Sequence, residues 1–131
     1  MHVYEYDEAK EYYEKAFAIS SETGDRKGEA ADYMNLGTRF LSCGEYEEAK
    51  ANLDKARAIT VEIGHRAGEA RCYGNLGQVF ESIGEYDKAK QYFKKGLVIS
   101  KEIGDREGEA ADYFNLGALF LMSHFLVIVN Y

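Results

Sequence analysis

The stretch GDRKGEAADYMNLG, which runs from Gly24 to Gly37, decides the fold because the chain carries two further copies of it. The copies GHRAGEARCYGNLG and GDREGEAADYFNLG follow at intervals of forty residues and begin at Gly64 and Gly104. The segments between them also repeat, and EYDEAKEYYEKAFAISSET, GEYEEAKANLDKARAITVEI and GEYDKAKQYFKKGLVISKEI begin at Glu5, Gly44 and Gly84. Self-similarity at a fixed period of this length indicates an array of stacked repeats.

Each half of the forty-residue unit has apolar residues at helical spacing. In the first half, four positions at offsets of 0, 3, 4 and 7 form one face of an α-helix: Tyr33, Leu36, Gly37 and Phe40. The second half has a longer stripe at Tyr46, Ala49, Leu53, Ala56, Ile59 and Ile63, which the first copy matches with Tyr6, Ala9, Tyr13, Ala16 and Ile19. We name the two predicted helices of a unit helix A and helix B.

Glycines at the ends of these patterns predict tight turns. Suitable residues for the left-handed position that closes helix B are Gly24, Gly64 and Gly104, and those that close helix A are Gly44 and Gly84. Asp25 and Asp105 follow as candidate N-caps of the next helix A, whereas His65 is a weaker cap. Turns this short permit only antiparallel packing of neighbouring helices.

Glycine inside helix A needs a separate reason, because a mid-helix glycine costs about 1 kcal/mol relative to alanine. Gly37, Gly77 and Gly117 nevertheless recur at the forty-residue period. Small residues let a neighbouring helix approach closely, and the aromatic residues of the stripe fill the space beside them. We therefore expect close contact between neighbouring helices at these glycines.

The pattern resembles the tetratricopeptide repeat family, in which an aromatic residue, Leu-Gly and a second aromatic mark helix A, and Ala, a large apolar residue and Ala mark helix B. The resemblance covers about residues 5–122, and its positions are Tyr33, Leu36, Gly37, Phe40, Ala49, Leu53 and Ala56, then Tyr73, Leu76, Gly77, Phe80, Ala89 and Phe93. The family's usual proline is absent, and the period is forty instead of about thirty-four. Both departures resemble the long-repeat subclass of the Partner-of-Inscuteable spindle-orientation scaffolds.

The expected fold is all-α, a tetratricopeptide-type right-handed α-solenoid of antiparallel helix pairs with about six helices. We expect a helix B at 5–23, repeats at 24–63 and 64–103, a helix A at 104–122 and an apolar C-terminal tail at 123–131. In this register the array starts inside one repeat and stops inside another. Terminal units of such arrays normally have a polar outer face, so two uncovered ends are predicted.

The apolar tail permits three interpretations. In the first, helix A continues and packs its extra surface on the preceding helix B, or the tail is disordered. In the second, the tail is an association surface, since exposed apolar patches of this extent usually meet a partner. The third is a membrane span, but the run from Ala118 to Val129 is shorter than the roughly 20 residues that a bilayer core requires.

In the resembled family, helix A lines a concave groove, so residues beside its core stripe are candidate ligand contacts. These are Met34, Asn35, Thr38, Arg71, Asn75, Gln78, Phe114 and Asn115. The recurring asparagine belongs, in the resembled subclass, to a ladder that grips an extended ligand, and an amide can both donate and accept hydrogen bonds. The alternative is that each asparagine bonds to a neighbouring helix and fixes the repeat spacing. Arg71 suits a ligand carboxylate.

The predicted function is a protein–protein interaction scaffold that binds a peptide or protein segment in the concave groove, without enzymatic activity. The alternative is a self-associating structural module that forms a dimer or oligomer through its orphan terminal helices and apolar tail. The residues expected to associate are Phe120, Leu121, Phe125, Leu126 and Ile128. An orphan helix A of one copy that docks on an orphan helix B of another would rebuild a whole repeat.

Charge and motifs exclude several other classes of function. The formal net charge of −7 disfavours nucleic acid and anionic lipid as partners. No phosphate-binding loop, nucleophile elbow or metal-ligand spacing occurs, so no catalytic residue, metal or cofactor is predicted. Cys43 and Cys72 are expected to be buried and too far apart for a disulfide. The N-terminal residues do not form a signal peptide, and the expected location is cytoplasmic.

Overall fold

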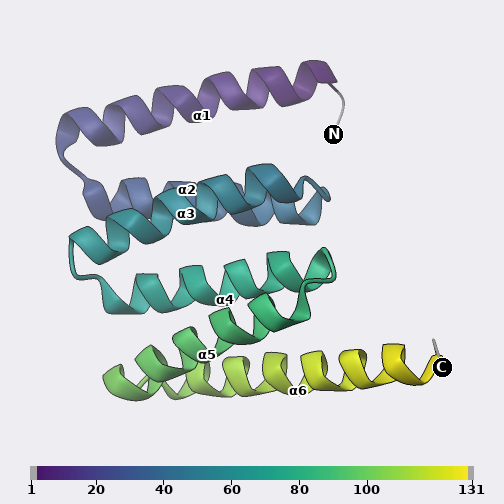
Figure 1. Ribbon diagram of the computed structural model, residues 1–131. Helices are drawn as coiled ribbons and strands as arrows, with labels where there is room; N and C mark the ends of the chain where they lie inside the picture. Colours follow the sequence, from purple (N-terminus) through teal and green to yellow (C-terminus); the bar gives the residue numbers. More distant parts are fainter. Residues whose placement is uncertain (1–2, 130–131) are drawn as a thin grey trace.

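The computed structural model describes residues 3–129, which form six α-helices (Figure 1). The helices are α1 (Val3–Thr23), α2 (Arg26–Ser42), α3 (Tyr46–Glu62), α4 (Arg66–Ser82), α5 (Tyr86–Ile103) and α6 (Arg106–Val129). α2, α4 and α6 are the A helices of successive repeats, and α1, α3 and α5 are B helices. The expected all-α helical repeat solenoid is confirmed, while the handedness of its superhelix stays a prediction.

The A and B helices form two layers. Consecutive helices run antiparallel and pack against each other along the chain (Figure 1). Successive A helices also contact each other, α2 with α4 and α4 with α6, whereas no two B helices are in contact within residues 3–129. The A helices therefore form the more closely spaced, inner layer, and the groove residues predicted on helix A belong to this layer.

The turns between helices follow the predicted chemistry. The five glycines that follow helices α1 to α5 have left-handed backbones, with φ between 70° and 80°. Asp25 accepts a hydrogen bond from the N–H of Gly28 at 2.9 Å, and Asp105 accepts one from the N–H of Gly108 at 3.0 Å. Both are confirmed as N-caps. His65 makes no capping hydrogen bond with its side chain at the start of α4, as expected for a weaker cap.

The glycines inside helix A lie directly against the apolar stripe of helix B. A Cβ atom added at Gly37 would lie 2.6 Å from Cγ of Leu53, and one added at Gly77 would lie 2.5 Å from the ring of Phe93. Both distances are far below van der Waals contact, so a side chain at either position would have to displace the buried side chain of Leu53 or Phe93. At Gly117 an added Cβ meets no atom within 4 Å, because no described helix follows α6.

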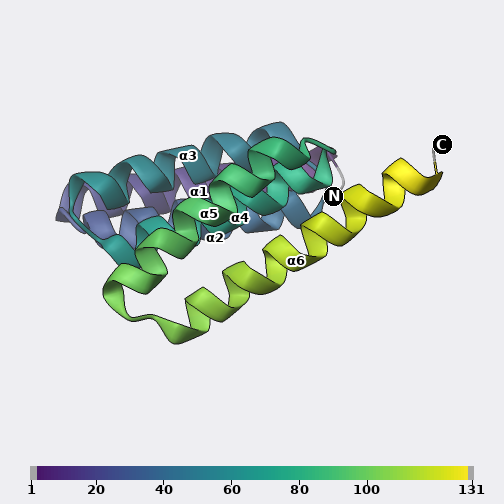
Figure 2. The same ribbon diagram turned by 60° about the horizontal axis from the view of Figure 1, so that its bottom comes forward.

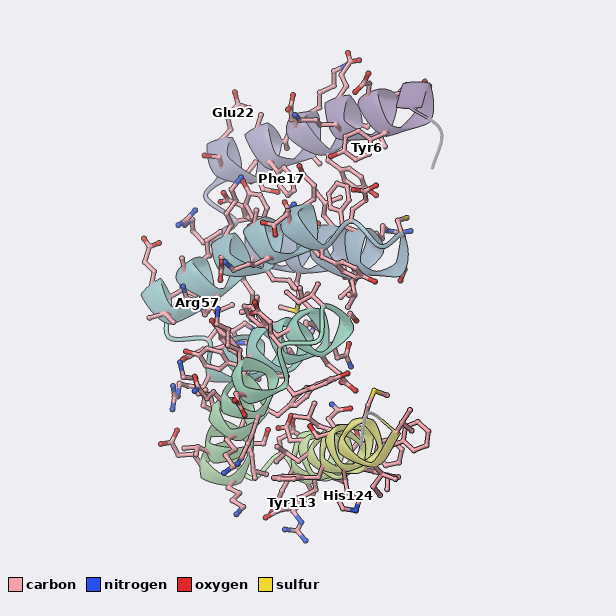
Figure 3. The ribbon with its side chains drawn as sticks, turned by 45° about the vertical axis from the view of Figure 1, so that its right-hand side comes forward. Tyr6, Phe17, Glu22, Arg57, Tyr113 and His124 are labelled. Atoms are coloured by element: carbon pink, nitrogen blue, oxygen red, sulfur yellow. The ribbon has the colours of Figure 1, made fainter. Side chains whose placement is uncertain are left out.

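α1 packs on α2 through aromatic side chains, and Phe17 points from α1 toward α2 (Figure 3). The rings of Phe17 and Tyr33 stack with centroids 4.0 Å apart. The predicted core stripe of this helix is wrong at its C-terminal part, since Ala16 is exposed and Ile19 is 59% exposed. Their counterparts in α3 and α5 are covered by the preceding helix A, and no described helix precedes α1.

α6 is longer than the helix A predicted at 104–122 and continues through the expected tail to Val129. Its C-terminal end projects beyond the other helices (Figure 2). Phe125 and Ile128 are 62% and 60% exposed, so the predicted packing of this extra surface on the preceding helix B is wrong for these side chains. No helix within residues 3–129 has both the length and the apolar character that a membrane crossing requires.

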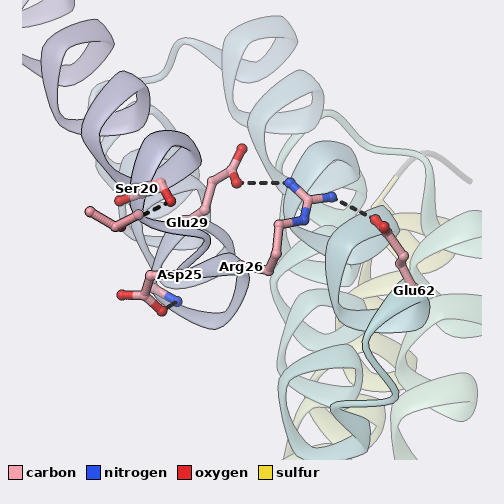
Figure 4. A network of polar contacts seen from close by, with 7 residues as sticks. Ser20, Asp25, Arg26, Glu29 and Glu62 are labelled. Carbon is pink, nitrogen blue, oxygen red and sulfur yellow. Dashed lines mark hydrogen bonds and ion pairs between the residues drawn. The ribbon is translucent and has the colours of Figure 1, made fainter.

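Each A helix starts with an arginine that forms at least one ion pair, and Figure 4 shows the pairs of Arg26. Arg26 donates to Glu29 in its own helix at 2.7 Å and to Glu62 at the end of α3 at 2.5 Å. The second repeat has the same arrangement at Arg66, Glu69 and Glu102. These bonds join the two helices of a repeat at their shared end.

We expect Gly77→Ala to destabilise the protein and Gly117→Ala not to. The alanine Cβ at position 77 would overlap the ring of Phe93, and such overpacking costs about 1–3 kcal/mol. At position 117 the methyl group meets open space, so a gain in helix propensity of up to about 1 kcal/mol remains. Urea denaturation followed by circular dichroism measures both free energies of unfolding, and equal effects would contradict the close contact between helices A and B.

Candidate functional site

The α4–α6 pocket lies between two successive A helices and has a volume of about 170 Å³. Its polar lining comes from α4, the end of α5 and α6, and includes Arg71, Asn75, Gln78, Ser100, Asp112 and Asn115. Four of the groove residues predicted from the sequence are therefore brought together here, namely Arg71, Asn75, Gln78 and Asn115.

The pocket is open because residue 74 is a glycine. The same position of the preceding repeat is Met34, which is only 5% exposed and belongs to the same core cluster as Cys72. The prediction that Met34 contacts a ligand is therefore wrong, because α4 packs on α2 and covers this position. Gly74 leaves the corresponding space between α4 and α6 empty of side-chain atoms.

Asp112 is the more deeply buried of the two carboxyl groups that line the pocket, with 7% of its surface exposed. Its Oδ2 accepts a hydrogen bond of 3.4 Å from the hydroxyl of Ser100, which is long for an O–H donor. Burial raises the pKa of Asp112 to about 6, with the bond from Ser100 opposing the shift and the charge of Asp105 adding to it. The carboxyl group is therefore mostly ionised at neutral pH.

The three recurring asparagines occupy the same position of α2, α4 and α6. Asn35 is exposed, and Asn75 and Asn115 are half-buried. Among the side chains that the structure describes, no other residue forms a hydrogen bond with any of the three amides. If the amides fixed the repeat spacing, each would form a hydrogen bond with a neighbouring helix, and the described residues contain no such bond. The amides are therefore available to a ligand.

The two remaining predicted groove residues lie at opposite ends of the inner layer. Thr38 is half-buried on α2, and its hydroxyl donates to the backbone carbonyl of Asn35 at 2.9 Å. Phe114 is 77% exposed on α6, where no described helix covers it. Neither residue contributes to the α4–α6 pocket, so they would meet a ligand only if it extended along the whole layer.

A second, more open hollow of about 540 Å³ extends the α4–α6 pocket toward α2. It is lined by Leu41 of α2, by Gln78 and Glu81 of α4 and by Asn115 of α6, among others. Burial raises the pKa of Glu81. Because Gln78 and Asn115 line both hollows, the candidate groove is continuous over all three A helices.

Two residues define the pocket, and sequence reasoning missed Asp112 and placed Gly74 beside the core stripe of helix A without a role of its own. Their signal is visible when the repeats are compared position by position. The residues aligned with Gly74 are Met34 and Phe114, and those aligned with Asp112 are Asp32 and Cys72. Two positions of the repeat thus carry different types of residue in different repeats, and the residues that differ, Gly74 and Asp112, line the same pocket.

A third pocket, of about 240 Å³, was also not predicted and lies between α1, α2 and α3. Its walls combine aromatic and charged side chains, and the aromatic ones are Tyr6, Tyr13, Phe17, Tyr33 and Phe40. The next repeat fills the equivalent space, because Tyr92 stacks on Phe80 with ring centroids 5.2 Å apart. The residue forty positions before Tyr92 is Asn52, which is too small to do the same.

The apolar residues expected to associate lie on α6. Their exposed fractions range from 55% to 72% for Phe120, Leu121, Phe125 and Ile128, and the side chain of Leu126 lies outside the described residues. Tyr113 adds to this surface, with 49% exposed, on the outer side of α6 (Figure 3). Lys90 of α5 places its ammonium group 5.1 Å from the ring centroid of Phe120. An apolar strip is thus presented along α6.

The cysteines and metal-binding residue types form no further site in the described residues. No group of three or more His, Cys, Asp or Glu side chains between residues 3 and 129 is placed to hold a metal ion. Cys72 is buried as predicted, and burial raises the pKa of its thiol to about 11. Cys43 is exposed, so its predicted burial is wrong. It caps the C-terminus of α2, outside the buried stripe.

Comparison with known proteins identifies the repeat. A tetratricopeptide repeat model matches residues 33–102, and a second tetratricopeptide repeat model matches residues 5–23. The first match alone spans more than half of the chain. No curated protein matches the sequence.

We expect Asp112→Asn to stabilise the protein at neutral pH. The folded pKa of about 6 lies above the value of roughly 3.9 in an unfolded chain. The folded state therefore binds the proton more tightly, and stability falls as the pH rises from about 4 to 7. At pH 7.5 the free energy of unfolding of the variant should exceed that of the wild type by about 1–2 kcal/mol. This figure allows for partial access of solvent to the pocket.

Urea denaturation of both proteins at pH 4, 5.5 and 7.5 measures this difference. The gain should shrink toward pH 4, where Asp112 is protonated in the folded wild type and about half protonated in the unfolded chain. Asp32→Asn, at the equivalent position of α2, is the control with the same change in charge. A gain that is independent of pH would contradict the raised pKa of Asp112.

Proposed function

Since the chain belongs to the tetratricopeptide repeat family, whose arrays generally serve as protein–protein interaction scaffolds, we propose that it binds an extended peptide or protein segment along α2, α4 and α6. The observation that carries the proposal is the row of Asn35, Asn75 and Asn115. Their amides make no hydrogen bond within the described residues. Asn75 and Asn115 line the first of two connected hollows, and Asn115 also lines the second.

An extended segment presents one backbone donor and one acceptor per residue, which must be satisfied when they leave water. An asparagine amide can meet both needs at once, and a row of amides at the repeat spacing can do so at successive places along the segment. The hollows beside the row would receive side chains, and Arg71 would receive a ligand carboxylate. The proposed activity is therefore binding without catalysis.

We also propose that the chain belongs to the long-repeat subclass of the Partner-of-Inscuteable scaffolds. The forty-residue period and the GDR…NLG and GEY…A runs support this assignment. Its proposed location is the cytoplasm, with which two free cysteines are compatible. The net charge of −7 favours a polypeptide over a nucleic acid as the partner.

Selection of random peptides displayed on phage against the immobilised full chain tests groove binding. The dissociation constants of selected peptides are then measured by fluorescence anisotropy with the wild type, Asn35→Ala and Asn75→Ala. Each substitution should weaken binding roughly tenfold, because it leaves a peptide group without its partner. The melting temperature should stay unchanged, because these amides form no bond within the described fold.

Asn52→Ala is the matched control, because Asn52 lies on α3, outside the inner layer, and its amide donates to the carbonyl of Glu48 at 2.8 Å. It should leave peptide affinity unchanged. Selected peptides that bind all three variants as tightly as the wild type would contradict the asparagine ladder. A large fall in melting temperature for Asn35→Ala or Asn75→Ala would assign the amides to the framework.

One specific observation favours a second function, the self-association of the 131-residue chain. Gly37 and Gly77 are covered by Leu53 and Phe93, whereas Gly117 is uncovered among the described residues. The residue forty positions before Leu53 is Tyr13, which lies on α1. We propose that α1 of a second copy docks on α6 with Tyr13 over Gly117, which would rebuild a helix A and helix B pair.

Sedimentation velocity over a range of protein concentrations tests this association. The wild type should form dimers or larger oligomers, and Gly117→Leu should be a monomer because the new side chain occupies the place of Tyr13. Ala118→Leu adds a larger side chain at the neighbouring position and should still associate. A monomeric wild type, or equal association of Gly117→Leu, would overturn the second function.

A further inference from the structure

We propose that the α4–α6 pocket is a subsite for a cationic side chain, lysine or arginine, of the bound segment, and that the carboxylate of Asp112 receives the charge. The proposal rests on the proposed groove function and names the chemistry of the partner at one place in it. It is carried by the placement of a buried carboxylate in the lining of a pocket that two of the three ladder asparagines also line.

The carboxylate of Asp112 sits where three helices meet. A Cβ added at Gly74 of α4 would lie 3.9 Å from its Oδ1, and one added at Gly96 of α5 would lie 3.3 Å from its Oδ2. Two glycines thus surround the group, and no side chain from either position shields it. Its Oδ1 accepts no hydrogen bond from the residues that the structure describes.

Asp112 also has no counter-ion within the described residues. No lysine or arginine between residues 3 and 129 forms an ion pair with it. The cation among the lining residues is Arg71, whose side chain is exposed and forms no ion pair with Asp112. A carboxylate that is buried without a counter-ion is costly. A ligand cation would supply the missing charge and hydrogen-bond donors.

The equivalent space one repeat earlier shows that the framework does not need this arrangement. There the positions of Gly74, Gly96 and Asp112 are occupied by Met34, Ala56 and Cys72, which are all buried in one apolar cluster. Three substitutions therefore turn a filled apolar contact into a polar pocket. Each of the three alone would lower stability, by loss of packing or by burial of charge, and together they create a site.

The size of the pocket fits the end of a long cationic side chain. A volume of about 170 Å³ leaves room for an ammonium or guanidinium group with an associated water molecule. The amides of Asn75 and Asn115, which also line the pocket, would hold the backbone that carries this side chain. The chain's net charge of −7 favours the approach of a basic segment.

Titration of the full ¹⁵N-labelled chain with N-methylguanidinium or n-butylammonium chloride tests the subsite without any peptide. Nuclear magnetic resonance should show saturable shifts of the side-chain amides of Asn75 and Asn115, with a dissociation constant on the order of millimolar. Asp112→Asn should abolish these shifts. Asp32→Asn, with the same change in net charge at the equivalent position of α2, should keep them.

Gly74→Met provides a variant without any change in charge. It places in the pocket the residue that the preceding repeat has at this position, and an added Cβ there meets only Oδ1 of Asp112, at 3.9 Å, so the fold should be retained. This variant should also lose the cation-dependent shifts. Shifts that persist in Asp112→Asn or Gly74→Met, or that are absent from the wild type, would overturn the subsite.

Peptides selected on the wild type separate this proposal from the groove function. A basic residue should recur in them, and its replacement by norleucine or citrulline should weaken binding about tenfold or more for the wild type but not for Asp112→Asn. Peptides that depend on Asn75 but contain no basic residue would overturn the cation subsite and leave the groove intact. Cation binding in the absence of any selected peptide would support the subsite and count against the ladder.

Discussion

The close approach of helix A to helix B at a single glycine is the contact on which the remaining structure depends. Gly37 lies against Leu53 and Gly77 against the ring of Phe93, at distances that admit no side chain. This contact fixes the separation of the two helices in a pair and the rotation of each about its axis. The apolar stripes then face inward, and the arginine at the start of helix A comes within hydrogen-bonding distance of the glutamate at the end of helix B.

Once helix A and helix B of a pair are fixed relative to each other, the next A helix can pack on the pair in only one way. It lies beside the previous A helix and under helix B, so three helices meet at one junction in each repeat. At the first junction the space is filled by Met34 and Cys72, and at the second it is the polar pocket around Asp112. The same three types of helix meet at both junctions, and the glycine contacts that hold each pair lie elsewhere. Residues at the junction can therefore change without a change of fold.

Much of the fold follows from the sequence because it depends on a repeated pattern. The six helices, the left-handed glycines and the N-caps at Asp25 and Asp105 are local features, and forty-residue periodicity supports each of them more than once. At the two ends of the array, the exposure of a residue depends instead on whether a neighbouring helix covers its face. Ile19 and Phe125 belong to apolar patterns but lie on faces without a described neighbour, so their exposure cannot be predicted from periodicity.

The site was only partly predictable for a related reason. Asn75 and Asn115 stand out because they recur, whereas Asp112 was assigned to no site since sequence alone does not show that it faces Gly74 and Gly96 across a junction. Met34 shows the opposite error, because a position beside the core stripe is covered once the next A helix packs on it. Recurrence thus identifies the framework and the ladder. Departure from recurrence identifies the pocket.

Stability and specificity make opposite demands on the junction around Asp112. Gly74 and Gly96 forgo packing that Met34 and Ala56 provide one repeat earlier, and Asp112 replaces a buried thiol by a carboxylate. A fold that needed every junction for its stability would not tolerate this combination. Here the neighbouring contact of Gly77 with Phe93 holds α4 and α5 together, so the junction beside it can be polar and unfilled. An ionised carboxylate in such a space is stabilised most by an external cation that binds beside it. This junction is therefore suited to the recognition of a cationic ligand.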